Sequence, residues 1–281
     1  MAGMMLMFAV GLRDDLVPLP ANLKLASQLI PFILLIHWGE FKLVSMYELI
    51  PWITFNDIFA WGITLFVFVV ITNSINLIDG LDGLAGTLCL VILSAYGIWF
   101  MYAGLEIPGY ICFSLVGSII AFLFFNWQPS RIFMGDTGAL TLGLVCAAMT
   151  ILFINQNYAL DPLHPAKITS GITMAVCIMV IPLTDTLRVF IIRISSGRSP
   201  FSADTNHVHH LLLRSGLSHS GAVSVLTLAN LFFIVLAFIG SEWPPQVLLM
   251  TVLFTAAGSI TMLLLFLKLR FKSKAQKAAV Q

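Results

Sequence analysis

The sequence predicts an all-α protein: a polytopic bundle of transmembrane helices with about eight full spans and a truncated span at the N-terminus. Hydrophobic residues make up 59% of the 281 residues and charged residues only 10%, whereas soluble domains average about 25% charged residues. The mean hydropathy is +0.99. In addition, eight apolar stretches are each long enough to cross the hydrocarbon core of a bilayer as a helix.

The eight predicted spans follow one another along the chain. They are residues 22–38, 57–73, 84–103, 109–126, 137–155, 168–187, 222–240 and 246–267. A ninth apolar stretch, MAGMMLMFAVGL at the start, is too short to cross the core at about 1.5 Å per residue. It has neither a basic segment nor a cleavage site of small residues, so we do not interpret it as a signal peptide. We expect residues 1–281 to form a single integral-membrane domain that opens with the end of a span.

Basic residues divide unevenly between the loops on the two sides of the predicted bundle. Of the 14 Lys and Arg residues, only Lys42 and Lys167 fall on one side, which leaves twelve on the other. The positive-inside rule predicts that the side with twelve is cytoplasmic. Every acidic residue on that side is an aspartate, which suits tight turns and metal sites. These residues are Asp14, Asp15, Asp79, Asp82, Asp136, Asp185 and Asp204.

Two of the aspartate motifs each allow two interpretations. Asp14 and Asp15 form either a helix cap or solvated turn, or a carboxylate pair that binds a divalent cation or accepts a proton. Asp136 lies between glycines in RIFMGDTGALTLG, at the start of a predicted span. It is either an N-cap or part of a phosphate site, because helix N-termini favour anions and glycine lets backbone approach phosphate.

The stretch NSINLIDGLDGLAG, residues 73–86, places polar side chains at every third position at the end of a predicted span. A two-glycine turn would explain the glycines and one aspartate. It would not explain asparagines at the membrane edge, where polar groups are costly unless they are used. Steps of three drift by about 60° on a helix. We therefore expect Gly80 and Gly83 to bend the chain and bring Asn73, Asn76, Asp79 and Asp82 together.

A histidine-rich stretch, SPFSADTNHVHHLLLRSG, follows the sixth predicted span. One interpretation is a zinc site, but the stretch has no cysteine and no HExxH spacing. Binding of an anion such as phosphate by imidazole and guanidinium groups is the alternative that fits better. The arginines nearby also have a simpler explanation in the positive-inside rule.

The four motifs, in this order, resemble glycosyltransferase family 4, the polyprenyl-phosphate N-acetylhexosamine-1-phosphate transferases. The motifs that carry the resemblance are DD at 14–15, NxxNxxDGxDGLAG at 73–86, FMGDTGA at 133–139 and the histidine stretch at 199–216. The HxHH pattern is most similar to the branch that makes undecaprenyl-diphosphate GlcNAc. Members usually have two helices and a basic loop upstream of the aspartate pair, so the resemblance implies that two N-terminal helices are lacking here.

The resemblance implies a reaction and its place. The enzyme would transfer a sugar-1-phosphate, in this branch GlcNAc-1-phosphate, from a UDP-N-acetylhexosamine to undecaprenyl phosphate and release UMP. This is the first membrane step of cell-envelope polysaccharide synthesis, such as that of lipopolysaccharide or teichoic acid. The expected site is on the cytoplasmic face of the inner (plasma) membrane. We expect membrane lipid but no nucleic acid as a partner, and the oligomeric state stays open.

The resemblance also implies residue roles. Mg²⁺, with Mn²⁺ as an alternative, would be held by Asp136 and Asn76. Asp14, Asp15 and Asp136 would be catalytic, with Asp14 or Asp15 taking a proton from the lipid phosphate. The implied substrate-binding residues are Lys24, Asn73, Asn76, Asp79, Asp82, His207, His209 and His210. Phosphoryl transfer depends mainly on positioning and charge neutralisation, and both direct attack and a covalent aspartyl intermediate stay open.

Rival classes fit the sequence less well. Secondary transporters keep ionisable groups near the bilayer midplane on broken helices, whereas here the aspartates lie at span ends on one side. A CDP-alcohol type phosphotransferase would need its own pattern of spaced aspartates, which is not present. A structural scaffold would not need clustered aspartate and histidine.

Overall fold

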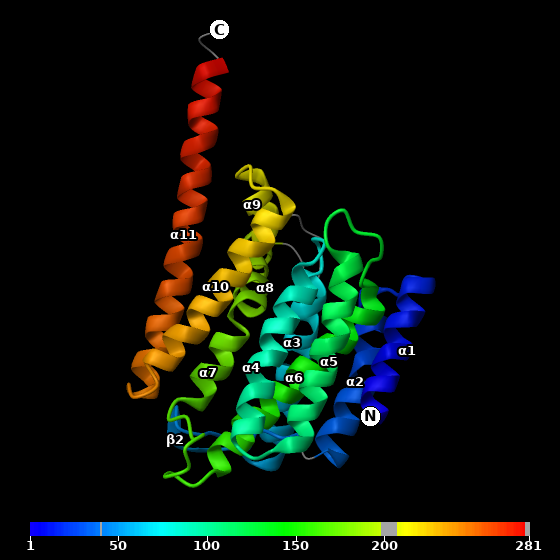
Figure 1. The fold of residues 1–281 in the computed structure, drawn as a ribbon, viewed down its shortest axis with the longest axis vertical. Helices are drawn as coiled ribbons and strands as arrows, with labels where there is room; N and C mark the ends of the chain where they lie inside the picture. Colours follow the sequence, from blue (N-terminus) through cyan, green and yellow to red (C-terminus); the bar gives the residue numbers. More distant parts are fainter. Residues whose placement is uncertain (40, 198–206, 279–281) are drawn as a thin grey trace.

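The computed structural model describes residues 1–39, 41–197 and 207–278, which form helices and one short hairpin. Figure 1 shows a bundle of helices from which α11 extends well beyond the others. The helices are α1 (Ala2–Leu16), α2 (Ala21–Trp38), α3 (Asp57–Ile78), α4 (Leu84–Tyr102), α5 (Glu106–Asn126), α6 (Gly135–Ala159), α7 (Gly171–Ile178), α8 (Val180–Ser195), α9 (Val208–Arg214), α10 (His219–Ile239) and α11 (Pro245–Ala278). The prediction of an all-α, polytopic bundle is confirmed.

Six helices in the described residues are long and apolar enough to cross a membrane: α3, α4, α5, α6, α10 and residues Pro245–Leu267 of α11. The predicted span 168–187 corresponds to α7 and α8, which are bent by 77° where they meet and count as a seventh span if taken together. The predicted span 22–38 corresponds to α2, which contains Lys24, Gln28 and His37 and is not among the six. The count of eight spans therefore stays a prediction.

The connection between α2 and α3 forms a small hairpin that the sequence did not predict. Strand β1 (Ser45–Met46) pairs antiparallel with β2 (Ile50–Thr54), with Ser45 opposite Thr54 and Met46 opposite Ile50. A tight turn joins the strands, and Tyr47 there has a φ of 46°. The strands are too short to show the alternation by which a strand is recognised.

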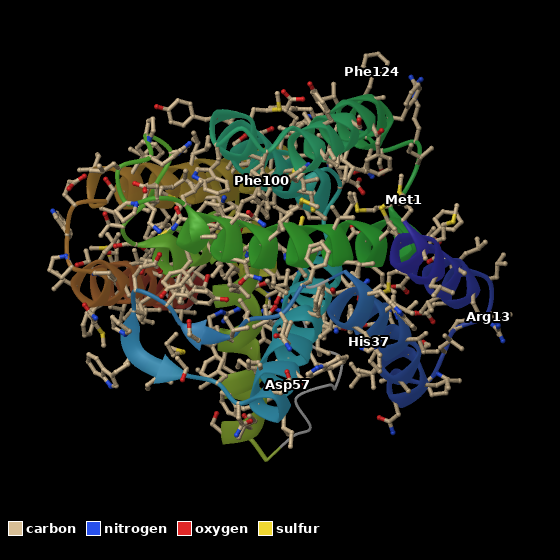
Figure 2. All side chains as sticks on the ribbon, turned by 90° about the horizontal axis from the view of Figure 1, so that it is seen from below. Met1, Arg13, His37, Asp57, Phe100 and Phe124 are labelled. Atoms are coloured by element: carbon tan, nitrogen blue, oxygen red, sulfur yellow. The ribbon has the colours of Figure 1, made fainter. Side chains whose placement is uncertain are left out.

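Helix α6 lies in the middle of the bundle and most of its side chains are buried. Its neighbours are α1, α3, α4 and α7. In Figure 2, Phe100 of α4 points into the bundle and Phe124 of α5 points away from it. Phe100 is fully buried, whereas 82% of Phe124 is exposed. The outer face of α5 is therefore free to contact lipid.

Glycines allow two helices to approach α6 at backbone distance. A Cβ atom on Gly11 of α1 would lie 2.5 Å from the Cα atom of Thr137, and one on Gly143 of α6 would lie 2.8 Å from the carbonyl oxygen of Thr72 in α3. Small residues at helix contacts in membranes permit this close packing. The glycines thus bring the end of α1 and the middle of α3 against α6.

The predicted functional loops lie at one end of the bundle. Figure 1 shows the α3–α4 turn, the α5–α6 loop and α9 toward the top of the view, and β2 at the bottom. Asp136 lies at the start of α6, whereas Lys167 donates hydrogen bonds to carbonyl groups at the other end of α6, including that of Asn157. The fold therefore separates the aspartate motifs from the loops that carry Lys42 and Lys167.

Candidate functional site

The side chains of four helices meet at the start of α6. Oδ1 of Asp136 accepts hydrogen bonds of 2.5 Å from Nζ of Lys24, in α2, and of 2.5 Å from Nδ2 of Asn76, in α3. Nζ of Lys24 also lies 2.8 Å from Oδ2 of Asp14, in α1. Lys24 and Asp136, which are 112 positions apart in the sequence, thus belong to one continuous polar cluster with Asp14 and Asn76.

Asp14 and Asp15 contact different partners, because neighbouring residues on a helix point about 100° apart. Asp14 binds Lys24, and its Oδ1 accepts a 2.6 Å hydrogen bond from the backbone N–H of Leu19. Asp15 points toward α6 instead. The structure thus gives the two carboxylates separate contacts, while binding of a divalent cation or of a proton by them stays a prediction.

Asp15 caps helix α6 from another helix. Its two oxygens accept hydrogen bonds from the backbone N–H groups of Asp136 and Thr137, at 2.8 and 2.9 Å, and from the hydroxyl of Thr137. Gly135 has a φ of +62°, and a Cβ atom there would lie 2.7 Å from an Asp15 oxygen. A carboxylate at a helix N-terminus satisfies free N–H groups and interacts favourably with the helix dipole. The side chain of Asp136 is therefore not the N-cap that one interpretation assigned to it.

Asn73 lies outside this hydrogen-bonded cluster. Its Nδ2 donates to the carbonyl of Val69 at 2.8 Å and to Oε1 of Gln28 at 3.1 Å. Helix α3 continues through Asn73 and Asn76 and ends at Ile78, so the two asparagines point in different directions. Sequence reasoning missed Gln28, which is fully buried. An amide side chain within an apolar stretch was the signal that could have found it.

Asp79 and Asp82 lie in the turn between α3 and α4. Burial first, and then the nearby carboxyl groups of Asp136 and Asp82, raise the pKa of Asp79 to about 7. Among the residues that the structure describes, no hydrogen bond or ion pair to the Asp79 or Asp82 side chain is found. Gly83 ends the turn with a φ of +78°. The turn thus adds acidic groups that lack protein partners beside Asp136.

The histidine stretch reaches the aspartate turn through His209. A Cβ atom on Gly80 would lie 2.6 Å from Nε2 of His209, so only glycine leaves room for the ring. His209 is 1% exposed, and neither ring nitrogen has a hydrogen-bond partner in the described ranges. Burial first, and then the neighbouring His210, lowers the pKa of His209 to about 4. The ring is therefore neutral at pH 7.

A buried aspartate of α8 fixes the start of the histidine helix. Oδ2 of Asp185 lies 2.8 Å from Nδ1 of His207, and its Oδ1 accepts a 2.8 Å hydrogen bond from the N–H of Val208. The rings of His207 and His209 stack with their centroids 5.6 Å apart, and the ring of His210 lies next to His209. Sequence reasoning gave Asp185 no role, although a charged residue near a span end was a signal for one. The first part of the motif, 199–206 with Asp204, lies outside the described residues.

The donor atoms at Asp136 fit a magnesium ion better than a zinc ion. Within the described part of the chain, no group of three or more His, Cys, Asp or Glu residues could hold a metal ion. Mg²⁺ commonly needs only one or two protein carboxylates, together with water and substrate phosphates. Asp136 and Asn76 offer the hard oxygen ligands that Mg²⁺ prefers. Several carboxyl groups here face one lysine, so the cluster has an excess of negative charge that a divalent cation would neutralise.

The fold and the site together define a polytopic membrane protein with a cluster of aspartates, one lysine and histidines at one end of its helices. The chain belongs to glycosyl transferase family 4, whose sequence pattern matches residues 1–154. This match covers α1 to most of α6, and with it the Asp14, Asn76 and Asp136 cluster.

Curated relatives are similar over most of this chain. It is 31% identical, over 84% of its residues, to the probable undecaprenyl-phosphate N-acetylglucosaminyl 1-phosphate transferase of Bacillus subtilis. It is 29% identical over 78% of its residues to the undecaprenyl-phosphate alpha-N-acetylglucosaminyl 1-phosphate transferase of Escherichia coli. It is 33% identical over 79% of its residues to the decaprenyl-phosphate N-acetylglucosaminephosphotransferase of Mycolicibacterium smegmatis. The matched regions span 64%, 59% and 58% of these relatives.

Proposed function

We propose that this protein transfers GlcNAc-1-phosphate from UDP-GlcNAc to undecaprenyl phosphate and releases UMP. The proposed site is the cluster at the start of α6, on the cytoplasmic face of the inner (plasma) membrane. The product would be the first lipid-linked intermediate of a cell-envelope polysaccharide. The names of the relatives support the acceptor and the sugar, and the UDP donor follows from the family resemblance.

One observation carries the proposal: Lys24, Asn76 and Asp136 meet at one point although they belong to three helices. A cation-binding carboxylate beside an ammonium group is what phosphoryl transfer needs, because this chemistry consists mainly of positioning and charge neutralisation. The site lies at the end of membrane helices. There it would meet both a water-soluble nucleotide sugar and a phosphate held at the membrane by its polyprenyl tail.

The proposed reaction needs no protein nucleophile. An oxygen of the lipid phosphate attacks the phosphorus that carries the sugar, and the bond from this phosphorus to the oxygen of UMP breaks. UMP leaves with that oxygen. Asp14 is a better candidate than Asp15 for holding a proton of the lipid phosphate, because one oxygen of Asp14 is held by the side chain of Lys24, whereas both oxygens of Asp15 accept backbone N–H groups of α6. Lys24 would then hold phosphate oxygens, and His209 and His210 would bind the sugar or its phosphate.

A magnesium ion, with Mn²⁺ as an alternative, would neutralise diphosphate charge when bound, and Asp136 and Asn76 would hold it. Asp79 and Asp82, in the adjacent turn, would contact the nucleotide sugar. Asn73 is better suited to joining α3 to α2 than to contacting the nucleotide sugar, because its amide donates to Gln28 of α2 and to the carbonyl of Val69.

We further propose that α2 and the bent pair α7–α8 lie in the membrane together with the six spanning helices, which gives eight spans. Helix α8 supports this placement because one of its faces is apolar and exposed. Leu187, Ile191 and Ile194 on this face are each more than half exposed. The opposite face carries Asp185 and the buried Arg193.

The test is a transfer assay in membranes that contain the full-length protein. Undecaprenyl phosphate is supplied with one UDP-sugar at a time, and both UMP and the lipid-linked product are measured. UMP release that requires both UDP-GlcNAc and the lipid phosphate supports the proposal. The proposal is refuted if UMP is released without an acceptor, or if no UMP is released with any of the UDP-sugars. The matched control is Lys42→Met, which removes an ion pair with Asp57 far from the site and should leave transfer unchanged.

A further inference from the structure

The ammonium group of Lys24 is surrounded by the oxygen atoms that would attract a divalent cation. Its Nζ lies 2.5 Å from Oδ1 of Asp136, 2.8 Å from Oδ2 of Asp14 and 3.5 Å from Oδ1 of Asn76. These oxygens come from α6, α1 and α3, and the lysine comes from α2. The protein therefore places its own positive charge among the acidic groups of the site.

The two carboxylates that bind Lys24 differ in how firmly they are held. The side chain of Asp14 is 6% exposed, and its second oxygen accepts the N–H of Leu19. The side chain of Asp136 is 28% exposed. Lys24 itself has a flexible four-carbon stem, which lets its ammonium move while its backbone stays in place. Of the charged groups in the cluster, Lys24 is thus the one best able to change partners.

We propose that Lys24 is an exchangeable counter-ion. It neutralises Asp14 and Asp136 while the site holds no substrate, and it moves to phosphate oxygens when a divalent cation arrives with a diphosphate. This inference rests on the proposed function, in which Asp136 holds a cation and Lys24 holds phosphate. Its new content is that the lysine competes with the cation until the diphosphate draws it away.

The exchange makes the binding of the cation and the diphosphate mutually dependent. A cation alone must displace an ammonium that has no other anion to bind. A diphosphate supplies that anion, so the cation and the diphosphate favour each other, and by linkage the effect is reciprocal. Removing the ammonium leaves Asp14 and Asp136 without their cation, so a metal ion should then bind without help from the diphosphate.

The experiment measures Mn²⁺ bound to the purified full chain in detergent, by equilibrium dialysis with free Mn²⁺ held fixed, with and without UDP. In the wild type, UDP should strengthen Mn²⁺ binding by at least about fivefold, the lower range of ordinary coupling between sites. In Lys24→Met, Mn²⁺ should bind at least about fivefold more tightly than in the wild type without UDP. In the same variant the strengthening by UDP should largely disappear.

Three further variants keep the test decisive. Lys24→Arg retains the charge and should retain the dependence on UDP. Lys24→Gln should behave like Lys24→Met and covers the case in which methionine does not fold. Lys42→Met removes a comparable lysine–aspartate contact, 2.5 Å long, at the other end of the bundle and should match the wild type.

Two results would overturn the exchange. One is equal Mn²⁺ affinity of the wild type and both neutral variants without UDP. The other is strengthening by UDP that persists in both. The proposed function is tested separately, because UMP release in the transfer assay does not enter this measurement. Coupled binding without any transfer would support the exchange and refute the function, and transfer without coupling would do the reverse.

Discussion

At the scale of single residues, the acidic groups of the site differ in what holds them. Asp14, Asp15 and Asp136 have hydrogen-bond donors from the protein, whereas Asp79 has neighbouring carboxyl groups. A carboxyl group with a raised pKa binds its proton in the folded protein at pH values where the unfolded chain has lost it. Asp79 therefore stabilises the folded state less as the pH rises from about 4 to 7.

Replacing Asp79 by asparagine should remove this pH dependence. Above pH 7 the wild type carries a half-buried negative charge beside other carboxylates, and Asp79→Asn does not. The variant should be more stable than the wild type at pH 8, by about 1–3 kcal/mol after allowance for water near the group. The difference should shrink at pH 5. Thermal unfolding in detergent at both pH values checks this, with the exposed loop residue Asp161→Asn as the control.

Asp136→Asn should abolish turnover while the bundle stays folded. The substitution keeps the side-chain shape but removes the charge that binds Lys24 and would hold a metal ion. Loss of an electrostatic group in a catalytic site costs about 100-fold or more. Two measurements check this: UMP release by the variant, and UMP release by the wild type in excess chelator. Full activity in chelator would show that no metal ion is required.

His209→Ala should slow turnover by raising the activation free energy of transfer by roughly 2–4 kcal/mol, as the loss of one hydrogen-bond donor in a dry site does. The ring is buried against Gly80 with free nitrogens, so it has hydrogen-bonding capacity available for a ligand. The measurement is the rate of transfer, with bound zinc determined on the same samples. An active variant that has lost zinc would instead establish a structural zinc site in the histidine stretch.

At the scale of elements, the site depends on how closely α1 approaches α6. Gly11→Ala would place a methyl group 2.5 Å from a backbone atom of Thr137, which cannot move like a side chain. Helix α1 would have to shift, and Asp14 and Asp15 with it. A displacement of about 1 Å costs about 100-fold in rate, and overpacking costs about 1–3 kcal/mol in stability. Transfer assays and unfolding measure the two effects.

The matched control for Gly11 is another helix glycine. A Cβ atom on Gly62 of α3, or on Gly117 of α5, would meet nothing within 4 Å. Both alanine variants should keep wild-type activity and stability. An equal loss in all three variants would mean that helix flexibility matters here and that close contact does not.

Some features at the element scale followed from the sequence and others did not. Hydropathy located the long helices, because every span needs enough consecutive apolar residues to cross the hydrocarbon core. The break between α7 and α8 was not predicted, because hydropathy alone was used and the signal of Pro182 in the first turn of α8 was missed. The carbonyl of Ile178 near this break accepts a hydrogen bond from Asn230 of α10. Pro182, four residues further on, has no N–H to donate to this carbonyl, so the amide of Asn230 satisfies it instead.

At the scale of the whole molecule, the two ends of the bundle should face opposite sides of the membrane. The four native cysteines are buried, so a cysteine introduced by mutation can be labelled selectively. Thr54→Cys, in the hairpin, should react in intact cells with a maleimide that cannot cross the membrane. Ser130→Cys, in the α5–α6 loop, should react only after the membrane is opened. The reverse pattern would place the aspartate cluster outside the cytoplasm.

The sequence located the candidate site better than it described it. The sorting of charges by side brought Asp14, Asp15, Asp136 and the histidines to one end of the molecule, because the positive-inside rule acts on whole loops. It could not separate Asp14 from Asp15, which differ only in the direction they leave α1. Nor could it exclude Asn73 from the cluster, since that depends on the position of Gln28 in another helix.

The cap that Asp15 provides for α6 also has a consequence for biosynthesis. The two partners of this contact, Asp15 and Asp136, are 121 residues apart. At synthesis rates of about 5–20 residues per second, roughly 6–24 s pass between their translation. During that interval the carboxylates of α1 have no helix terminus to bind. A nascent chain arrested before residue 135 would carry Asp14, Asp15 and Lys24 without the start of α6, so the order in which helices leave the translocon decides when the site can first assemble.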